Sequence, residues 1–183
     1  ALISVQIAGA QTPPKVIFGS QPAMITGAAP KDTAISAMFF FTPDKASLAQ
    51  KKCNFPDDDY NMNEKDHVTV VNAKMANGQY EIDYSPIGIQ GQCRYVLTEI
   101  DVNINGNKIF EDLTLSPLAL APTEDDLALP VKDASPMFCD SSVGWCQSDR
   151  NAQIYSFTPQ DQKITIDFKD ISEKPVDADS DGQ

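Results

Sequence analysis

Few groups in this 183-residue chain could do nucleophilic chemistry, because it contains a single histidine, His67. A serine or cysteine nucleophile needs a base, usually histidine, held against it. His67 stands at the start of a predicted strand, and no G-x-S-x-G motif is present to expose a serine at a strand-to-helix turn. We therefore assign no catalytic residue and expect His67 to have a structural role.

The four cysteines, Cys53, Cys93, Cys139 and Cys146, could bind a metal or form disulfides. Zinc sites usually combine thiolate and imidazole ligands in closely spaced pairs, whereas this chain has no C-x-x-C pair and only one histidine. Two disulfides are the better interpretation, and four cysteines allow three connectivities. We favour Cys139–Cys146, which closes a short loop, together with Cys53–Cys93 as the longer link.

Disulfides indicate where the protein works, because they persist in oxidising compartments. We therefore expect a periplasmic or extracellular protein, either free or tethered to a membrane in a longer form. None of the nine asparagines heads an N-x-S/T sequon, which favours a bacterial envelope over a glycosylating secretory route. No apolar run approaches the ~20 residues that a membrane-spanning helix needs, so we expect no transmembrane segment.

Two internal acidic segments have residue types that could bind calcium. The adjacent aspartates at 57–59 point in different directions, which is poor geometry for one ion. Residues 101–112 place Asp and Asn at several EF-hand positions, but they contain Asn105-Gly106, the typical pair of a type I′ hairpin turn. We therefore expect a hairpin at 101–112.

The C-terminal segment D-A-D-S-D-G-Q matches the first seven positions of an EF-hand loop, with carboxylates at Asp177, Asp179 and Asp181. A working loop also needs a bidentate carboxylate at position 12 and a following helix. We expect no metal and no cofactor, with these three aspartates as the remaining candidates in a longer chain. Residues 173–183 are expected to form a disordered acidic tail.

A pair of carboxylates could act as in a glycoside hydrolase, given 26 Asp and Glu residues. Such a pair needs apolar surroundings that raise the pKa of one member. The acidic clusters here lie in polar segments, and no two carboxylates stand out. A glycoside or peptidoglycan hydrolase therefore stays as an alternative function.

The net charge limits the class of partner. The 26 acidic residues stand against 14 Lys and Arg, giving a formal charge of −12. Nucleic acids and anionic lipids are bound by cations, so this charge argues against both. A protein with a basic surface is the natural partner, although acidity also serves solubility.

The loop closed by Cys139 and Cys146 is the candidate contact surface. A disulfide-closed loop loses less conformational entropy on binding, and tryptophan is a common anchor of protein interfaces. Trp145 could instead pack against the disulfide, since a lone tryptophan is usually well buried. The candidate partner-binding residues are Phe138, Asp140, Val143 and Trp145.

The elements that must carry these residues are mostly short strands. Residues 34–41 are apolar on both faces, which is typical of a central strand. Two hairpins follow, 67–75 with 79–84 across Ala76-Asn77-Gly78 and 93–104 with 107–115 across Asn105-Gly106. In strand 93–104, the face expected to pack carries Val96, Ile100, Val102 and Ile104, and the face expected to be wet carries Glu99, Asp101 and Asn103.

Two further elements complete the prediction. A last hairpin should join residues 152–157 to 163–171 through T-P-Q-D-Q. One helix is expected at 44–52, because Thr42 can cap it and Pro43 suits the first helical position.

About nine short strands and one short helix predict an all-β fold, namely an antiparallel β-sandwich, of which an immunoglobulin-like arrangement is one form. Trp145 lies beside Cys146 and not midway between two distant cysteines, so the hallmark of immunoglobulin domains is missing. We expect one sandwich domain at 1–172, followed by the tail.

These features predict a non-enzymatic, disulfide-stabilised protein that acts by protein–protein binding, as a monomer or small homo-oligomer. The most concrete version is an inhibitor or immunity protein for a secreted toxin or hydrolase. The first alternative is a structural or adhesive module of a surface assembly, which would associate through exposed strand edges.

Overall fold

The structure is a computed structural model, in which the chain is described over ten segments. The described residues are 16–30, 32–53, 67–104, 107–108, 114–117, 129–130, 136–140, 145–148, 154–158 and 161–175. The candidate residues Val143, Asp57 to Asp59, Asp177, Asp179 and Asp181 lie outside them.

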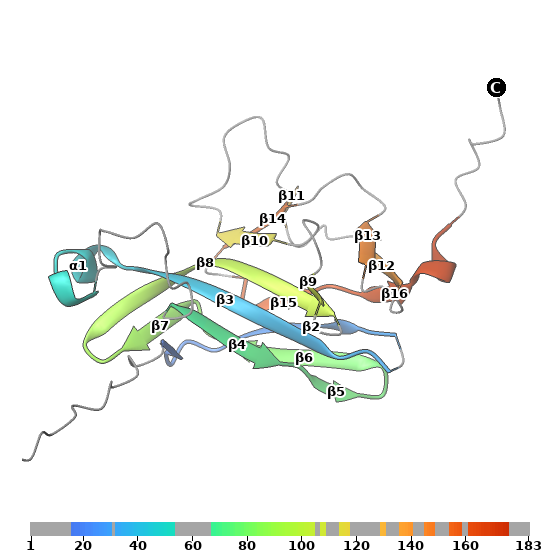
Figure 1. Cartoon of the computed structure of the whole chain (residues 1–183), viewed down its shortest axis with the longest axis horizontal. Helices are drawn as coiled ribbons and strands as arrows, with labels where there is room; N and C mark the ends of the chain where they lie inside the picture. The colour runs from blue at the N-terminus through green and yellow to red at the C-terminus, as the bar shows by residue number, and fades with distance from the viewer. Residues whose placement is uncertain are drawn as a thin grey trace, which may run out of the picture.

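The first part of the chain forms eight strands and two short helical segments (Figure 1). In chain order these elements are β1 (Ile17–Phe18), β2 (Ala23–Ala28), β3 (Ile35–Pro43), α1 (Lys45–Leu48), the 3-10 helix η1 (Lys51–Cys53), β4 (Val68–Asn72), β5 (Lys74–Ala76), β6 (Gln79–Tyr84), β7 (Ile87–Gln90) and β8 (Cys93–Ile104).

The second part adds shorter elements. They are β9 (Asn107–Lys108), β10 (Thr114–Pro117), β11 (Leu129–Pro130), β12 (Met137–Asp140), β13 (Trp145–Ser148), β14 (Ile154–Phe157), β15 (Lys163–Thr165), β16 (Phe168–Asp170) and the 3-10 helix η5 (Ile171–Glu173).

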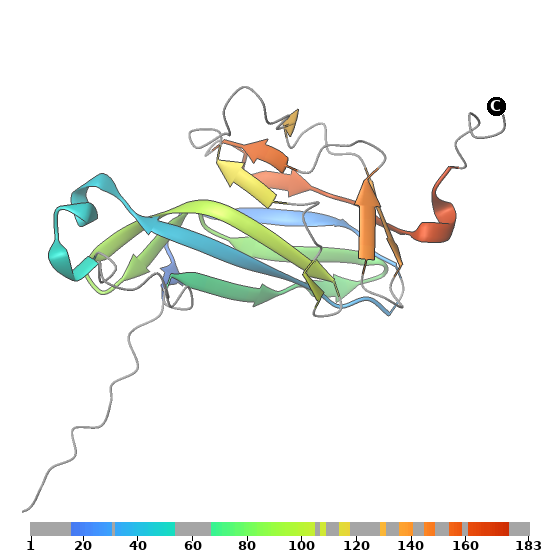
Figure 2. The same ribbon diagram turned by 45° about the horizontal axis from the view of Figure 1, so that its top comes forward.

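The described strands form three sheets: a large sheet around β8, a four-stranded sheet in the order β15-β2-β6-β5, and a three-stranded sheet in the order β13-β12-β16. The chain passes between the first two sheets at β2 to β3 and, across shorter connections, at β1 to β2, at β4 to β5 and at β6 to β7. The short connections, such as Ala73 between β4 and β5, keep the edges of the two sheets next to each other. The first part is therefore a nearly closed, barrel-like antiparallel arrangement (Figures 1 and 2).

Two turns follow directly from the sequence. Ala76 pairs with Gln79, so Asn77 and Gly78 are the two central residues of a hairpin, with φ angles of 52° and 72°. Positive φ at both positions is what a type I′ turn requires. Ile104 likewise pairs with Asn107, so β8 and β9 form a hairpin over residues 103–108 in place of the helix–loop–helix of an EF-hand, and residues 109–112 of the predicted hairpin lie outside the described residues.

The expected pairing of the first hairpin is right only for its turn-proximal part. β5 pairs with β6, whereas β4 pairs with β3 in the large sheet. The strand changes sheet at Ala73, whose N–H donates to the Ile35 carbonyl. A turn motif reports only the few residues around the turn, so it could not show that residues 68–72 pair with β3 and not with β6.

A β-bulge in β8 changes which residues share a face. Phe40 pairs with Glu99 and Phe41 with Leu97, so Thr98 is the extra residue, and its hydroxyl donates to the Phe40 carbonyl at 3.2 Å. A bulge shifts the side-chain alternation by one residue. Val96 therefore lies on the opposite face from Ile100, and the prediction that they share the packed face is wrong.

The same strand shows a second departure from the expected wet face. Asp101 and Asn103 are buried, while Glu99 is only half-buried. Asp101 lies opposite Met38 on one side and Thr114 on the other. Alternation alone predicts that this face of β8 is solvated. The face is buried because β10, from the second part, pairs alongside β8 at Asp101.

The core of the barrel-like part is aromatic. β3 lies between β4 and β8 as a central strand, which confirms the prediction for residues 34–41. The Phe39 ring packs edge-on against Phe18 at a centroid distance of 5.2 Å and stacks on Tyr84 at 5.2 Å. These contacts join the large sheet to the four-stranded sheet, since Phe39 comes from β3 and Tyr84 from β6.

Parallel pairing distinguishes the second part. β14 pairs in parallel with β10 and β11, β12 with β16, and β15 with β2. The prediction of a hairpin between 152–157 and 163–171 is therefore wrong. The turn at Thr158 to Asp161 does form, because the Thr158 N–H donates to the Asp161 carboxylate at 2.6 Å, but the two strands then join different sheets.

A close backbone approach docks the second part on the first. A Cβ on Gly27 would lie 1.8 Å from the Ile166 carbonyl oxygen, so only glycine fits there. The Tyr80 hydroxyl donates to the same carbonyl at 2.8 Å, and the Tyr80 ring packs on Phe168 at 5.5 Å.

The helix is shorter than expected. β3 continues through Thr42 and Pro43, which pair with Val96 and Tyr95. Asp44 is therefore the N-cap, and its carboxylate accepts from the Ser47 N–H at 2.8 Å. Strand pairing overrides the cap that Thr42 and Pro43 predict. Among the described residues, no helix is long and apolar enough to cross a membrane.

The fold is thus mostly β with one short α-helix, as expected, but it is not a clear two-sheet sandwich. The wholly antiparallel arrangement is also wrong, because four strand pairs run parallel. The physical reason is that the second part returns over the barrel through long connections, which turn signals do not specify.

Candidate functional site

The β12–β13 hairpin carries the loop that the sequence singled out. Cys139 and Cys146 are direct partners across the two strands and form a disulfide, with their Cα atoms 4.0 Å apart. Both cysteines are buried. The connecting residues are 141–144, and in both views the hairpin lies at the end of the molecule away from α1 (Figures 1 and 2).

The root of this hairpin is fixed to the rest of the fold. Met137 and Phe138 are buried beside Cys139, and all three pair with β16. Phe168 in β16 packs on Tyr80 of the barrel-like part. The strands that flank the connection are therefore held in place before any partner binds, so they lose little freedom on binding.

The candidate contact residues of the hairpin separate into different environments. Phe138 is only 3% exposed, so it supports the hairpin from inside, and its expected role as a contact residue is not compatible with that burial. Asp140 is half-buried and lies opposite Trp145 in the strand register. Val143 lies outside the described residues, as does the side chain of Trp145.

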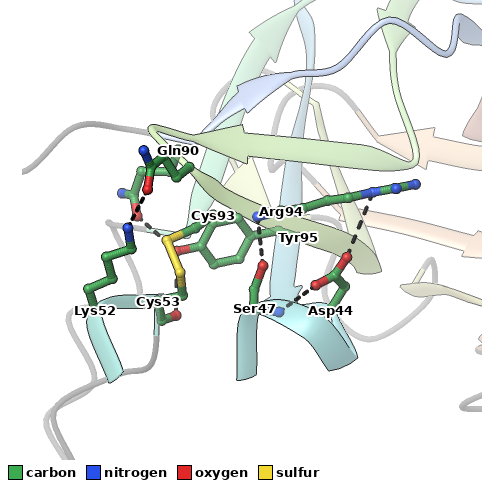
Figure 3. The surroundings of a disulfide bond; sticks show 9 residues. Asp44, Ser47, Lys52, Cys53, Gln90, Cys93, Arg94 and Tyr95 are labelled. Carbon is green, nitrogen blue, oxygen red and sulfur yellow. Dashed lines mark hydrogen bonds and ion pairs between the residues drawn. A yellow bond between two sulfur atoms is a disulfide. The ribbon is translucent and has the colours of Figure 1, made fainter. Parts of the chain in front are cut away.

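The second disulfide links Cys53 to Cys93 at the far end of the barrel-like part, with Cα atoms 5.5 Å apart (Figure 3). The two disulfides are the pairs favoured from the sequence. They are consistent with an oxidising, extracytoplasmic compartment. No thiol is left as a nucleophile, because all four cysteines are paired.

A small polar network fixes α1 beside this disulfide (Figure 3). The Arg94 N–H donates to the Ser47 hydroxyl at 2.8 Å, and the Asp44 N–H donates to the Arg94 carbonyl at 2.9 Å. The Arg94 side chain lies 3.8 Å from the Asp44 carboxylate. The N–H of Ser47 and the Arg94 guanidinium both lower the pKa of Asp44 below its usual value.

The surface of this end is apolar where β1, β7 and β8 meet. Ile17 lies opposite Ile89, and Ile87 lies opposite Val96. Directly opposed residues share a face of a sheet, so these four side chains form one patch, the β1–β7–β8 patch. Ile17 is 63% exposed and Val96 37%, while Ile87 and Ile89 are half-buried.

Sequence reasoning missed this patch for a definite reason. Regular alternation places Val96 on the same buried face as Ile100, but the bulge at Thr98 turns the Val96 side chain to the outer face. Ile17 lies in a two-residue strand, and no turn motif in the sequence predicts where that strand begins or ends. Short strands with a bulge carry too weak a pattern for their faces to be predicted.

His67 has a structural position next to this end. Its ring packs on Tyr95 at a centroid distance of 4.9 Å, and its carbonyl accepts from the Phe41 N–H at 3.0 Å. Tyr95 in turn donates to Gln90 at 2.9 Å. These contacts place the single histidine in packing around the Cys53–Cys93 disulfide.

The perturbed tyrosines are also part of the packing. Burial raises the pKa of Tyr80 and of Tyr84, with smaller contributions from Asp167 and Asp161 respectively. Both phenols therefore stay protonated at physiological pH and act as neutral groups.

Within the described residues, no cluster of three or more His, Cys, Asp or Glu side chains could hold a metal ion. No protein-family model, curated protein or solved structure matches the chain. The functional argument therefore depends on the β12–β13 hairpin.

Proposed function

We propose that this chain is a non-enzymatic binding protein of the bacterial periplasm or exterior, which contacts a partner protein through the connection of the β12–β13 hairpin. The observation that carries this proposal is the hairpin root, where Cys139 and Cys146 are buried, directly opposed and joined. A short connection on a rigid root is suited to recognition, because binding orders little additional chain.

The concrete form of the proposal is an inhibitor or immunity protein for a secreted toxin or hydrolase. The net charge of −12 supports a partner with a basic surface, since complementary charge speeds encounter and excludes wrong partners. Asp140 stands at the start of the connection and supplies a carboxylate for such a surface.

Site-specific photo-crosslinking tests the proposal. A photoreactive residue is placed at Val143 in the connection and, as a matched control, at Val70, which is 61% exposed on β4 in the other part of the molecule. The proteins are irradiated with the envelope fraction of the producing cell. We expect one discrete protein adduct at position 143 that is absent at position 70 and is lost on Trp145→Ala.

The adduct also decides whether the protein inhibits. The crosslinked partner is identified, purified and assayed for its own activity with and without this chain, and inhibition is expected at equimolar ratio. The absence of any adduct at 143, or the same adduct at both positions, would contradict the proposal.

A structural or adhesive role is the second candidate, supported by the edge strands. Among the described pairings, β13 pairs only with β12 and β5 only with β6, so each leaves one side free for an added strand. Strand addition would give open-ended polymers, which light scattering detects. Hydrolysis assays on peptidoglycan and envelope polysaccharides test the acid-pair alternative.

A further inference from the structure

The tip of the β5–β6 hairpin carries an asparagine that is followed by glycine. Asn77 and Gly78 are the two central residues of the turn, with φ angles of 52° and 72°. The tip lies at the end of the barrel-like part away from α1 (Figure 1). Both residues are exposed, so water reaches the turn.

An Asn-Gly pair is open to a reaction of its own backbone. The nitrogen of the following residue bonds to the side-chain carbonyl carbon, ammonia leaves, and a five-membered succinimide ring remains. Water then opens the ring at one of its two carbonyls, giving aspartate or, in greater amount, isoaspartate. A side chain on the following residue hinders the attack, and glycine has none. The reaction needs no enzyme and no co-reactant other than water.

The surroundings of the turn leave room for this reaction. Within the described part of the chain, a Cβ built on Gly78 would meet one atom within 4 Å, the Ala29 carbonyl oxygen at 3.9 Å. Asn77 also lines a surface hollow together with Asp32 and Met75, both of which are exposed. The side-chain amide of Asn77 therefore lies next to solvent.

β5 is a short and exposed strand, which lets the turn open locally. It consists of three residues, all of them exposed. Beyond the strand pairing with β6, the Ala29 N–H donates to the Gly78 carbonyl at 3.0 Å. Hydrogen bonds at the exposed end of a short strand open more readily than those of the core. In the opened turn the Asn77 side chain can reach the Gly78 nitrogen.

We propose that Asn77 is a site of spontaneous deamidation, and that its isoaspartate product opens the β5–β6 hairpin. Aspartate keeps the number of backbone atoms, and Asp-Gly suits a type I′ turn as Asn-Gly does. Isoaspartate adds a methylene to the backbone between Ala76 and Gln79, the pair that closes the turn. Turn length fixes the register of a hairpin, so this product cannot keep the same pairing.

Deamidation also changes the charge at this end of the molecule. The amide of Asn77 becomes a carboxylate, which adds one negative charge to the formal −12 of the chain. The new carboxylate stands on the hollow that already carries Asp32. The β12–β13 hairpin takes no part in the reaction, so this proposal and the proposed function are tested separately.

Peptide mapping of the aged protein tests the site. The purified full chain is incubated at pH 8 and 37 °C, and samples taken over several weeks are reduced and digested with trypsin. Asn77 is the single asparagine of the tryptic peptide 75–94, and Asn72 is that of 66–74. Asn72 is the matched control, because it is exposed on β4 and precedes Ala73.

The two peptides should age at different rates. We expect 75–94 to gain about 1 Da roughly tenfold faster than 66–74 or more, because the residue after Asn72 carries a Cβ that glycine lacks. Equal rates in the two peptides would overturn the proposal.

Asn77→Asp separates the effect of charge from that of the backbone. Deamidated protein is isolated by anion exchange, and its isoaspartate is quantified by enzymatic methylation. Hydrogen exchange is then measured over β5 and β6 in this fraction, in wild type and in Asn77→Asp. We expect faster exchange in the isoaspartate fraction than in Asn77→Asp, which has the same charge and a normal backbone. The same exchange in both would contradict the opening of the hairpin.

Discussion

The two disulfides hold this molecule together in different ways. Cys53–Cys93 joins residues 40 apart and fixes η1 to the start of β8, at the end of the antiparallel barrel-like part. Cys139–Cys146 joins residues 7 apart that are already paired across one hairpin. The first therefore restrains the path of a long chain segment, and the second fixes the shape of one small surface.

The surroundings of the disulfides differ in the same sense. At the Cys53–Cys93 end, strands β3 and β7 both pair with β8, and the His67 ring packs on Tyr95. The Cys139–Cys146 hairpin reaches the core through β16, whose Phe168 packs on Tyr80. We expect the barrel-like part to set the stability of the fold and the hairpin to set recognition.

The largest effect should come from emptying the barrel interior. Phe39→Ala removes a fully buried ring between Phe18 and Tyr84 and should cost roughly 3–5 kcal/mol of unfolding free energy. Urea denaturation followed by circular dichroism measures it. Phe40→Ala, on the outer face of the same strand and half-buried, is the control and should cost clearly less. Equal losses would show that β3 is not oriented as described.

Removing each disulfide compares the two regions directly. The chain-entropy model predicts that Cys53→Ala with Cys93→Ala costs about 4 kcal/mol, and Cys139→Ala with Cys146→Ala about 2.5 kcal/mol, because the second loop is shorter. Urea denaturation of both double variants tests the order. The hairpin variant should lose the crosslink from position 143 while retaining its fold. A larger loss of stability in the hairpin variant would reverse the comparison.

High pH should destabilise the barrel-like part. Burial raises the pKa of Tyr80 and Tyr84, so the stability they contribute is present below the ordinary phenol pKa of about 10 and is lost as pH rises above it. Each phenol should remove about 1.4 kcal/mol per pH unit above 10. Urea denaturation at pH 9, 10 and 11 measures the slope.

Tyr84→Phe provides the control for this slope. It retains both disulfides, so alkaline disulfide exchange is common to the variant and the wild type. The slope above pH 10 should become shallower in Tyr84→Phe, and an unchanged slope would rule out the buried phenol as its cause.

The smallest effects should come from two helix caps, one in each region. Asp44 accepts from the Ser47 N–H beside the first disulfide, and Asp170 accepts from the Ser172 side chain and N–H in η5. These bonds lower the pKa of both carboxyls, so their contribution is present above the ordinary carboxyl pKa and is lost as pH falls through the lowered values.

Thermal denaturation at pH 7 and pH 3 tests the caps. Asp44→Ala and Asp170→Ala should each lower Tm slightly at pH 7 and by less at pH 3, where the carboxyls are partly protonated. Asp44→Asn keeps a capping oxygen at both pH values and should reduce the pH dependence. A decrease at pH 3 as large as that at pH 7 would argue against the charged cap.

Some features of the site follow from sequence and others do not. The central strand at 34–41 and the turns at Asn77-Gly78 and between Ile104 and Asn107 depend on residue types close in sequence. Four cysteines leave three connectivities open, so the sequence could only favour the pairs that the structure contains. The β1–β7–β8 patch does not, because it needs Ile17, Ile87 and Val96 from three strands and a bulge at Thr98.

The sequence by itself determined the β class, the acidic net charge and the positions of the tight turns. The reason is that composition and local backbone preference act over a few residues. Only the tertiary structure decided the sheet to which each strand belongs, the parallel pairs of the second part, the burial of Phe138 and Asp101 and the exposure of Val96. These depend on contacts between segments far apart in the chain, such as Gly27 against Ile166, and no local pattern encodes such contacts.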